Sequence, residues 1–438
     1  MLAAALALFA LQSPAKLPPV SRSDASKLAE LLEAALIDPQ AASALEKHAG
    51  ALQAKYDFAS LIAALRSGPA LPSGEPKPRG KGKKAEKLER FGSVQYGFTF
   101  ASGDDTFRYG VDVPAKYDPR KPAPLLIDPG HGSGAKESDE GKAGFLAFYR
   151  GQCDAAGLES ALIVRTEIVE QIGADGLRGA RPEDDVALVF DACFRDLASR
   201  FSIDLERVFV AGLSQTGFWS WQLGQARADR FAGIAPMSAV SFQQRFALPN
   251  FTQLSVFVLH GDADPICPVA QPRETVKQLE QLGVRVRFDE IAGAKHELAV
   301  WARLNEGLRW IAERPRTAYP QKLAKTVQTL RQPWCYWLRL DRIAKEASGE
   351  AGQPMTASVF AESDGQVLRI TSKGVEALTV GLASEMLDLE QPVTIMWNER
   401  KAFDGLPKRD FARAAGVALE KVDWRGTFEA FVELRGGK

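Results

Sequence analysis

The chain has 438 residues, of which 45% are hydrophobic, and this length suffices for one large α/β domain with smaller additions. Its 55 basic and 55 acidic residues give a formal net charge of zero. The charge balance therefore gives no support to nucleic acid or an anionic surface as the main partner.

The chain begins with a short apolar stretch. Residues 1–19 (MLAAALALFALQSPAKLPP) are too few to span a bilayer, and the apolar run ends in small residues near Ala15. The pattern predicts a signal peptide at residues 1–19, and hence a secreted or periplasmic protein without stable membrane insertion. The basic residues that usually precede such a core are missing, so an apolar tail is the alternative.

Two segments separate this stretch from the main domain. Residues 20–66 are rich in Ala, Leu, Glu and Lys at helical spacing, with an interruption at Asp38 and Pro39, and they predict two helices. Residues 67–90 are rich in Gly, Pro and Lys, which cannot bury apolar surface, and they predict a flexible, exposed linker.

Residues 91–314 alternate between strand and helix patterns. An edge hairpin at 92–113 is followed by predicted strands at 125–127, 161–164, 207–211, 233–237, 255–260 and 284–289, and by helices at 144–156, 183–200, 215–227 and 299–311. This order predicts an α/β domain with a mostly parallel, doubly wound sheet. Ligands of such sheets bind at the carboxyl ends of the strands. A Gly-rich excursion at 172–181 is a candidate substrate-contacting loop.

A glycine turn follows the strand at 125–127. The sequence from Pro129 to Gly134 (PGHGSG) can direct backbone N–H groups toward the oxyanion of a tetrahedral intermediate. A flexible glycine turn without a function is the alternative. His131 is expected to orient this loop rather than to act as a base.

The turn after the strand at 207–211 has the composition of a nucleophile elbow. In the sequence GLSQTG at 212–217, Ser214 stands at the apex between strand and helix. Such a serine takes a strained backbone conformation, and small neighbours let the strand and the helix approach closely. Gly212 meets this demand, whereas Thr216 stands where glycine is usual. A βα turn with an incidental serine is the alternative.

Two later loops carry groups that can activate a serine. A serine hydroxyl needs a base within reach and a carboxylate that orients the base. Of the four histidines, only His296, in a loop before the last helix of this domain, is well placed as the base. Asp264, which follows a buried strand and precedes Pro265, is the favoured acid, and Asp262 stays open as its rival. The order Ser, Asp, His is that of the α/β-hydrolase fold.

The four cysteines show no metal-binding or redox spacing. They are widely separated, and a core of this size does not need disulfides. They are Cys153, Cys193, Cys267 and Cys335.

Residues 325–438 have a different character, with short alternating strands joined by Gly, Asp and Pro turns and one helix at 409–419. They predict a small β-sandwich-like accessory domain. Its aromatic residues are expected to form a core rather than to stack on sugar rings. These aromatic residues are Trp334, Tyr336, Trp337 and Trp397.

Residues 92–312 resemble the secreted carboxylesterase branch of the α/β-hydrolases, which includes feruloyl and acetylxylan esterases and polyhydroxyalkanoate-depolymerase-like proteins. The stretches that carry the resemblance are FRYGVDVPAKYDPRKPAPLLI, HGSG at 131–134, FSIDLERVFVAGLSQTG, HGDADPICPV and GAKHEL. Two positions depart from the pattern: Thr216 replaces glycine, and Asp128 stands before the glycine turn where the family is usually apolar.

The resemblance implies Ser214 as nucleophile, Asp264 as orienting acid and His296 as base, with backbone amides of Ser133 and Gln215 as oxyanion donors. It implies a serine carboxylesterase that acts through an acyl-enzyme on small-molecule, acylated polysaccharide or polyester-type esters, and that needs no metal or organic cofactor. A serine peptidase of the prolyl-oligopeptidase type and an inactive hydrolase-fold binding protein are the alternatives. The sequence leaves the oligomeric state open.

Overall fold

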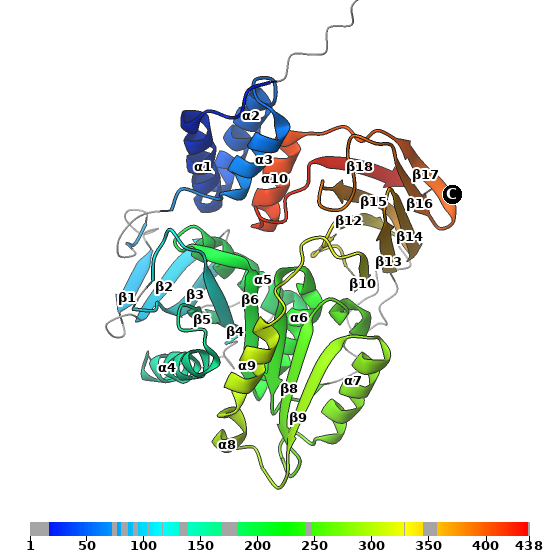
Figure 1. The fold of residues 1–438 in the computed structure, drawn as a ribbon. Coiled ribbons are helices and arrows are strands. Elements are labelled where there is room, and N and C mark those ends of the chain that lie inside the picture. Colours follow the sequence, from blue (N-terminus) through cyan, green and yellow to red (C-terminus); the bar gives the residue numbers. More distant parts are fainter. Residues whose placement is uncertain are drawn as a thin grey trace, which may run out of the picture.

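The computed structural model describes residues 17–71, 77–79, 86–90, 95–102, 105–115, 117–130, 139–168, 182–241, 247–327, 329–344 and 357–436. Three parts follow one another along the chain: amino-terminal helices, a large central sheet with its helices, and carboxyl-terminal strands (Figure 1). The predicted signal peptide falls almost entirely on residues 1–16, which are outside the described ranges.

The described part of the central region forms a nine-stranded sheet in the order β1-β2-β3-β5-β4-β6-β7-β8-β9. Strands β1, β2, β3 and β5 pair antiparallel, whereas every pair from β5 to β9 is parallel. The mostly parallel sheet and its edge hairpin are therefore confirmed. The strands are β1 (Lys87–Arg90), β2 (Gln95–Ser102), β3 (Asp105–Asp112), β4 (Ala123–Asp128), β5 (Leu162–Ile168), β6 (Ile203–Leu213), β7 (Gly233–Met237), β8 (Ser255–Gly261) and β9 (Arg285–Ile291).

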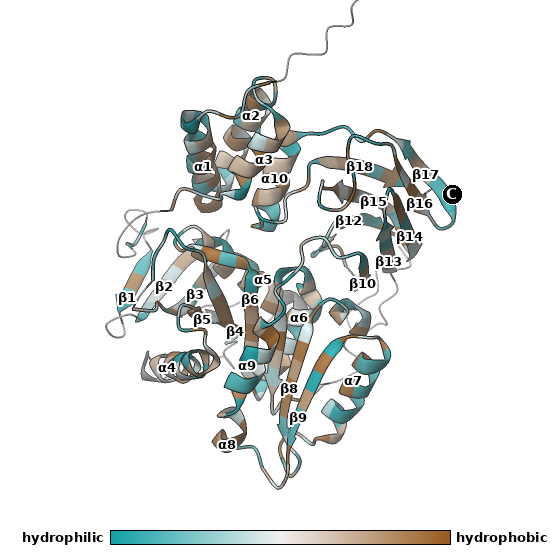
Figure 2. Cartoon of the chain, in the orientation of Figure 1, coloured by the Kyte–Doolittle hydropathy of each residue, from teal (hydrophilic) through white to brown (hydrophobic). Residues whose placement is uncertain are grey.

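Helices cover both faces of this sheet because its central strands are apolar on both sides. Leu125 and Ile127 of β4 belong to one hydrophobic cluster and Leu126 to another. Figure 2 shows the resulting brown colour along β4 and β6. The first cluster includes residues of α5 (Pro182–Ala198), α6 (Gln215–Ala226) and α7 (Ala270–Gln281), and the second includes residues of α4 (Asp139–Ala156), α8 (Leu298–Trp301) and α9 (Leu304–Ala312). The doubly wound arrangement is thus confirmed, although two helices replace the single one expected at 299–311.

The amino-terminal segment contains three helices where the sequence predicted two: α1 (Arg22–Ile37), α2 (Ala42–Gln53) and α3 (Phe58–Arg66). They pack against a helix near the other end of the chain, α10 (Phe411–Lys421) (Figure 1). The Gln53 side chain accepts a hydrogen bond from the Phe411 amide at 2.7 Å and donates one to the Arg409 carbonyl at 3.2 Å. The two ends of the chain therefore share one core.

The segment at 67–90, predicted as an exposed linker, keeps several exposed residues but also contacts the central region. Arg79 donates to the Ser199 hydroxyl at 2.8 Å and to the Ser199 carbonyl at 2.9 Å, and β1 lies in the same stretch. Guanidinium groups are weakly hydrated, so an arginine can occupy a partly buried position where carbonyl and carboxylate groups accept its hydrogen bonds.

The carboxyl-terminal strands form two sheets, as a β-sandwich-like domain requires. Buried aromatic side chains fill the space between and beside them: Trp334, Tyr336, Trp337 and Trp397 are each at most 8% exposed. The core interpretation of these aromatic residues is therefore confirmed. One sheet has the order β10-β13-β14-β16-β17 and the other β11-β12-β15-β18, formed by β10 (Lys322–Val327), β11 (Trp334–Cys335), β12 (Leu338–Ile343), β13 (Ala357–Asp364), β14 (Val367–Lys373), β15 (Val375–Leu382), β16 (Val393–Trp397), β17 (Arg400–Gly405) and β18 (Ala430–Arg435).

A buried ion pair joins the carboxyl-terminal region to the central sheet. Both nitrogens of the Arg316 guanidinium fork bond to Asp423, at 2.9 and 3.2 Å, and the same side chain donates to the carbonyls of Leu205 and Asp229. Burial alone would raise the pKa of Asp423, but Arg316, together with Arg230 and other nearby cations, lowers it below its ordinary value.

The four cysteines are all buried, and none of them forms a disulfide. Among the described helices, none combines the length and apolar character that a membrane crossing demands.

Replacing Asp423 by Asn should destabilise the protein by about 3 kcal/mol at pH 7, because the Arg316 charge stays buried without its counter-ion. Since the pKa of Asp423 is lowered on folding, this stabilisation is complete above the unfolded-state pKa of about 3.9 and is lost as the pH falls further. Urea unfolding of both proteins from pH 7 to pH 3 measures the difference. The exposed Asp404→Asn control should change little, and a difference that grows as the pH falls would contradict the assignment.

Candidate active site

Ser214 stands between β6 and α6 with φ 54° and ψ −117°, a conformation that non-glycine residues rarely adopt. Its amide donates to the Met237 carbonyl at 2.8 Å, and its own carbonyl accepts from the Phe218 amide at 3.0 Å. These bonds tie the serine to the end of β7 and to the first turn of α6. The backbone at Ser214 is thus held in the strained form that the nucleophile elbow demands.

Two glycines allow this close contact between strand and helix. A Cβ on Gly212 would lie 2.2 Å from the Thr216 carbonyl oxygen and 2.7 Å from the Ser220 hydroxyl. A Cβ on Gly217 would lie 2.7 Å from the Ala239 side chain. Any larger residue at either position would push α6 away from the sheet edge and alter the turn at Ser214.

Thr216 fits the elbow because its hydroxyl bonds within the turn. The buried Thr216 Oγ1 accepts from the Leu213 amide at 2.9 Å and donates to the Leu213 carbonyl at 3.2 Å. Both backbone groups of the residue before the serine are therefore satisfied by a side chain that glycine lacks. The departure from the usual pattern preserves the elbow in this chain.

Asp264 and His296 lie together in the loops that follow β8 and β9. The distance from His296 Nδ1 to Asp264 Oδ2 is 2.7 Å. The other carboxylate oxygen accepts from the amides of Ile266 at 2.9 Å and Cys267 at 2.8 Å. Burial alone would raise the pKa of Asp264, but these amides and His296 lower it below its ordinary value. Asp264 is thus a fixed anion against one nitrogen of the imidazole.

Asp262, the rival acid, has another partner. Its Oδ1 accepts from the Gly293 amide at 2.6 Å, in the loop that carries His296. It therefore holds the histidine loop to the end of β8, whereas Asp264 contacts the imidazole itself. This geometry favours Asp264 over Asp262 as the orienting carboxylate.

A chain of contacts connects the imidazole to the serine. Trp301 packs edge-on against His296, with ring centroids 5.6 Å apart, and its indole N–H donates to the Ser238 hydroxyl at 3.1 Å. Ser238 follows Met237, whose carbonyl accepts from the Ser214 amide. Because parallel strands end at one edge of the sheet, β6, β8 and β9 bring Ser214, Asp264 and His296 to that same edge.

Three further residues lie at this site, His260, Trp301 and Ser238, to which the sequence pattern gave no role. His260 is fully buried, its Nε2 lies 2.7 Å from the Cys267 carbonyl and 3.7 Å from Asp264, and burial lowers its pKa. Because a carbonyl oxygen only accepts, Nε2 carries the proton of a neutral ring. A neutral His260 does not offset the negative charge of Asp264, which therefore acts on His296. The sequence signal for His260 is its place near the end of a buried strand, after a run of apolar residues.

Asp128, the second departure from the family pattern, is buried and forms an ion pair with Arg165. The two residues are register partners on β4 and β5. Arg165 in turn lies over the Phe145 ring, 4.1 Å from its centroid. An acidic residue is accepted here because the neighbouring strand supplies its counter-ion.

The oxyanion donors are described in part. Gln215 is the first residue of α6, where helix geometry leaves the N–H without an acceptor inside the helix. Ser133, the second predicted donor, and His131 lie outside the described residues, as does the candidate substrate loop at 172–181.

Replacing Thr216 by Val should lower the free energy of unfolding by about 1–3 kcal/mol, because the partly buried Leu213 amide loses its acceptor while the volume is kept. Thr216→Ser keeps the hydroxyl and is the matched control, expected to retain most of the stability. Chemical denaturation of the three proteins measures the effect. Equal stability of wild type and Thr216→Val would show that the hydroxyl does not support the turn.

Part of the chain is similar to known esterases and thioesterases. Residues 190–302 match the family model described as phospholipase/carboxylesterase. Acyl-protein thioesterase 1 from Neurospora crassa is 29% identical over 133 residues, which cover 28% of this chain and 54% of that protein. The chain thus spans about half the length of this relative.

Solved structures of esterases are also similar. A thermostable esterase is 21% identical with a TM-score of 0.42, covering 50% of this chain and 62% of that chain. A ferulic acid esterase from the anaerobic fungus Anaeromyces mucronatus is 14% identical with a TM-score of 0.39, covering 54% and 93%. The strand order, the elbow at Ser214 and the family match at 190–302 together identify the central region as an α/β-hydrolase fold.

Proposed function

We propose that this protein is a serine hydrolase that cleaves carboxylic esters through an acyl-enzyme. The observation that carries the proposal is the 2.7 Å bond between Asp264 and His296 at the sheet edge where Ser214 sits in its strained turn. In this proposal Ser214 is the nucleophile, His296 the base and Asp264 the fixed carboxylate, the groups that acyl transfer requires.

The mechanism follows from the roles of the three side chains. His296 Nε2 takes the proton as Ser214 Oγ attacks the ester carbonyl, and it returns that proton to the departing alcohol. Water then attacks the acyl-enzyme with the same base. Asp264 stays ionised, keeps the Nδ1 proton on the imidazole and stabilises the imidazolium that forms in each step.

The tetrahedral intermediate carries a negative oxygen that needs hydrogen-bond donors. The Gln215 amide supports this role, since it lies at the amino terminus of α6 beside the nucleophile and adds the positive end of the helix dipole. We propose the Ser133 amide as the second donor, as the resemblance to carboxylesterases implies.

The matched family supports esters over other substrates. Its description names phospholipases and carboxylesterases, and the similar Neurospora crassa protein is named a thioesterase. Oxygen esters and thioesters pass through the same acyl-enzyme. We propose acylated polysaccharide or polyester-type esters as the substrate class and export to the periplasm or medium, as the sequence pattern implies.

Replacing Ser214 by Ala should lower the hydrolysis of p-nitrophenyl acetate by at least about 10³-fold, because it removes the hydroxyl that forms the acyl-enzyme. Assays with methyl ferulate, an acyl thioester and a peptide arylamide define the leaving group. Equal rates in wild type and Ser214→Ala would refute the esterase proposal. Cleavage of the arylamide alone would support a peptidase instead.

Replacing Asp264 by Asn should lower kcat on the order of 10⁴-fold, because the amide favours the wrong imidazole tautomer. Asp262→Asn is the matched control from the same loop: its side-chain oxygen still accepts from Gly293, so kcat should stay within about threefold. Steady-state kinetics of both variants with p-nitrophenyl acetate test the assignment. A larger loss in Asp262→Asn than in Asp264→Asn would reverse the roles of the two residues.

A further inference from the structure

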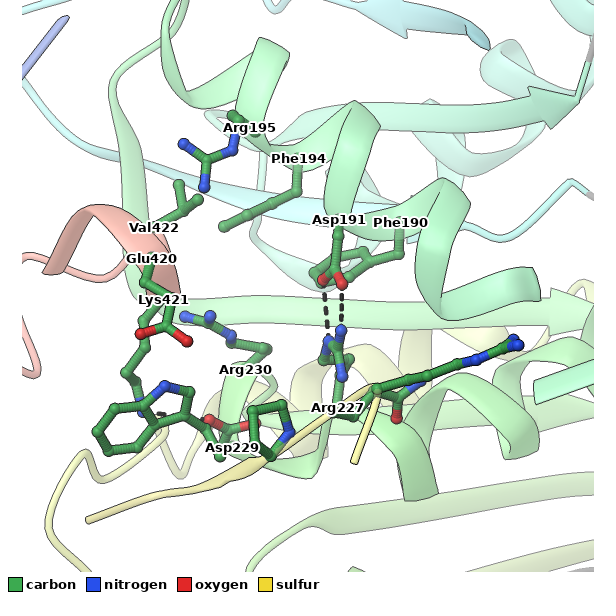
Figure 3. Close-up of a pocket in the computed structure, with 14 residues that line it drawn as sticks. Phe190, Asp191, Phe194, Arg195, Arg227, Asp229, Arg230, Glu420, Lys421 and Val422 are labelled. Atoms are coloured by element: carbon green, nitrogen blue, oxygen red, sulfur yellow. Dashed lines mark hydrogen bonds and ion pairs between the residues drawn. The ribbon is translucent and has the colours of Figure 1, made fainter. Parts of the chain in front are cut away.

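A pocket of about 240 Å³ lies where the catalytic region meets the carboxyl-terminal region. Its walls come from α5, from the short helix η3 (Ala228–Arg230), from the end of α10 and from the residues around β11 (Figure 3). Since η3 leads into the amino end of β7, the pocket lies at the opposite edge of the sheet from Ser214. It is therefore separate from the proposed active site.

The pocket wall carries an excess of positive charge. Five cationic side chains (Arg195, Arg227, Arg230, Arg331 and Lys421) and three carboxylates (Asp191, Asp229 and Glu420) line it. Two of the carboxylates are paired within the pocket, because Arg227 binds Asp191 and Lys421 lies 3.2 Å from Asp229. The third, Glu420, lies 3.7 Å from Arg339, which is not part of the wall.

Arg195 and Arg230 are left without a carboxylate at ion-pair distance in the described part of the chain. Arg195 has a carbonyl acceptor, Leu419, at 3.1 Å, whereas the Arg230 guanidinium has no hydrogen-bond partner among the described residues. Figure 3 shows Arg195, Arg230 and Lys421 approaching the pocket from three different elements. Guanidinium forks bind carboxylate and phosphate groups with two parallel hydrogen bonds, so the unpaired Arg230 is able to hold such a group.

A second donor in the same wall also lacks a partner. Trp334 is only 8% exposed, and its indole N–H is buried without an acceptor among the described residues. The ring cannot turn freely toward water, because it stacks on Phe428 at 5.7 Å and lies 4.8 Å below the Lys421 ammonium. Buried donors are nearly always satisfied, so an orphan of this kind points to an acceptor that binds from outside the chain.

The charged side chains of the wall shift one another's pKa values. Burial lowers the pKa of Arg195; attraction to Asp191 and Glu420 opposes this shift, whereas repulsion from Arg230 acts in the same direction as burial. Burial alone would raise the pKa of Asp229, but Lys421, Arg230 and other cations hold it well below its ordinary value. Cationic side chains therefore outnumber carboxylates in the wall.

We propose that this pocket binds a small organic anion through a phosphate or carboxylate group held by Arg230, Arg195 and the Trp334 indole N–H. The buried rings of Phe190 and Phe194 and the Pro333 ring supply an apolar surface for the rest of the molecule. The volume lies just below the roughly 300–1,000 Å³ of drug-sized ligand pockets, which favours a ligand of about one ring. Such a ligand bridges α5 and η3 to α10, and it stabilises the contact between the two regions.

Calorimetric titration of the full chain with phenyl phosphate, inorganic phosphate and benzoate tests the proposal, with sodium chloride at matched ionic strength as the reference. We expect saturable binding at one site, tighter for phenyl phosphate than for inorganic phosphate, and a rise in the unfolding temperature with ligand concentration. The Ser214→Ala protein should bind equally well, because the pocket does not involve the serine. Tighter binding of benzoate than of phenyl phosphate would assign the pocket to carboxylates.

Two variants test whether the anion binds in this pocket. Arg230→Gln should weaken phenyl phosphate binding by about tenfold or more, because it removes a charge-assisted donor. Trp334→Phe keeps the stacked ring, removes the N–H and should weaken binding several-fold. Arg207→Gln, which alters an arginine paired with Asp204 outside the pocket, is the matched control and should leave binding unchanged.

The proposal is overturned if none of the three anions binds saturably. It is also overturned if binding occurs but Arg230→Gln and Trp334→Phe both bind as wild type does, because the anion then sits elsewhere. Circular dichroism and thermal unfolding of each variant show whether a loss of binding reflects a loss of fold.

Discussion

The backbone conformation of Ser214 is the constraint on which the site depends. A positive φ at a serine is unfavourable, so neighbouring contacts must stabilise it. Here the Met237 carbonyl, the close approach allowed by Gly212 and the hydroxyl of Thr216 provide these contacts. Together they hold α6 close to the end of β6, with Gln215 as the first residue of the helix directly after the serine. Thr216 shows that the elbow requires a satisfied turn at this position rather than glycine as such.

Hydrogen bonds to Asp264 determine the charge distribution at the site. Backbone amides from the loop after β8 hold the Asp264 carboxylate, which keeps it charged although it is buried. Burial lowers the pKa of the neighbouring His260 and so favours its neutral form. The fixed negative charge is therefore directed to His296, and Asp262 keeps the histidine loop in place from the other side. Asp264 and His296 form one unit built from the loops that follow two adjacent strands.

The two ends of the parallel strands have different roles. Ser214, Asp264 and His296 lie at the carboxyl ends of the strands. Residues 325–438 attach at the amino ends through buried charges. Arg316 connects Asp423 to backbone carbonyls beside the sheet, and Lys421 reaches Asp229. Buried ion pairs contribute little net stability when complete but penalise any arrangement that separates them. They therefore fix how the two regions meet, and the anion pocket lies in that same contact.

The sequence by itself determined the parallel sheet, the elbow and the order of the candidate residues. These features depend on local properties: continuous apolar strands, the backbone freedom of Gly212, and the spacing of Ser214, Asp264 and His296 along the chain. Only the tertiary structure decided that Asp264 rather than Asp262 contacts the imidazole, that Arg165 neutralises Asp128, and that Arg79 is drawn into the protein. The physical reason is that a charged side chain is stabilised by partners distant in sequence, and local pattern does not specify which partner the fold brings near.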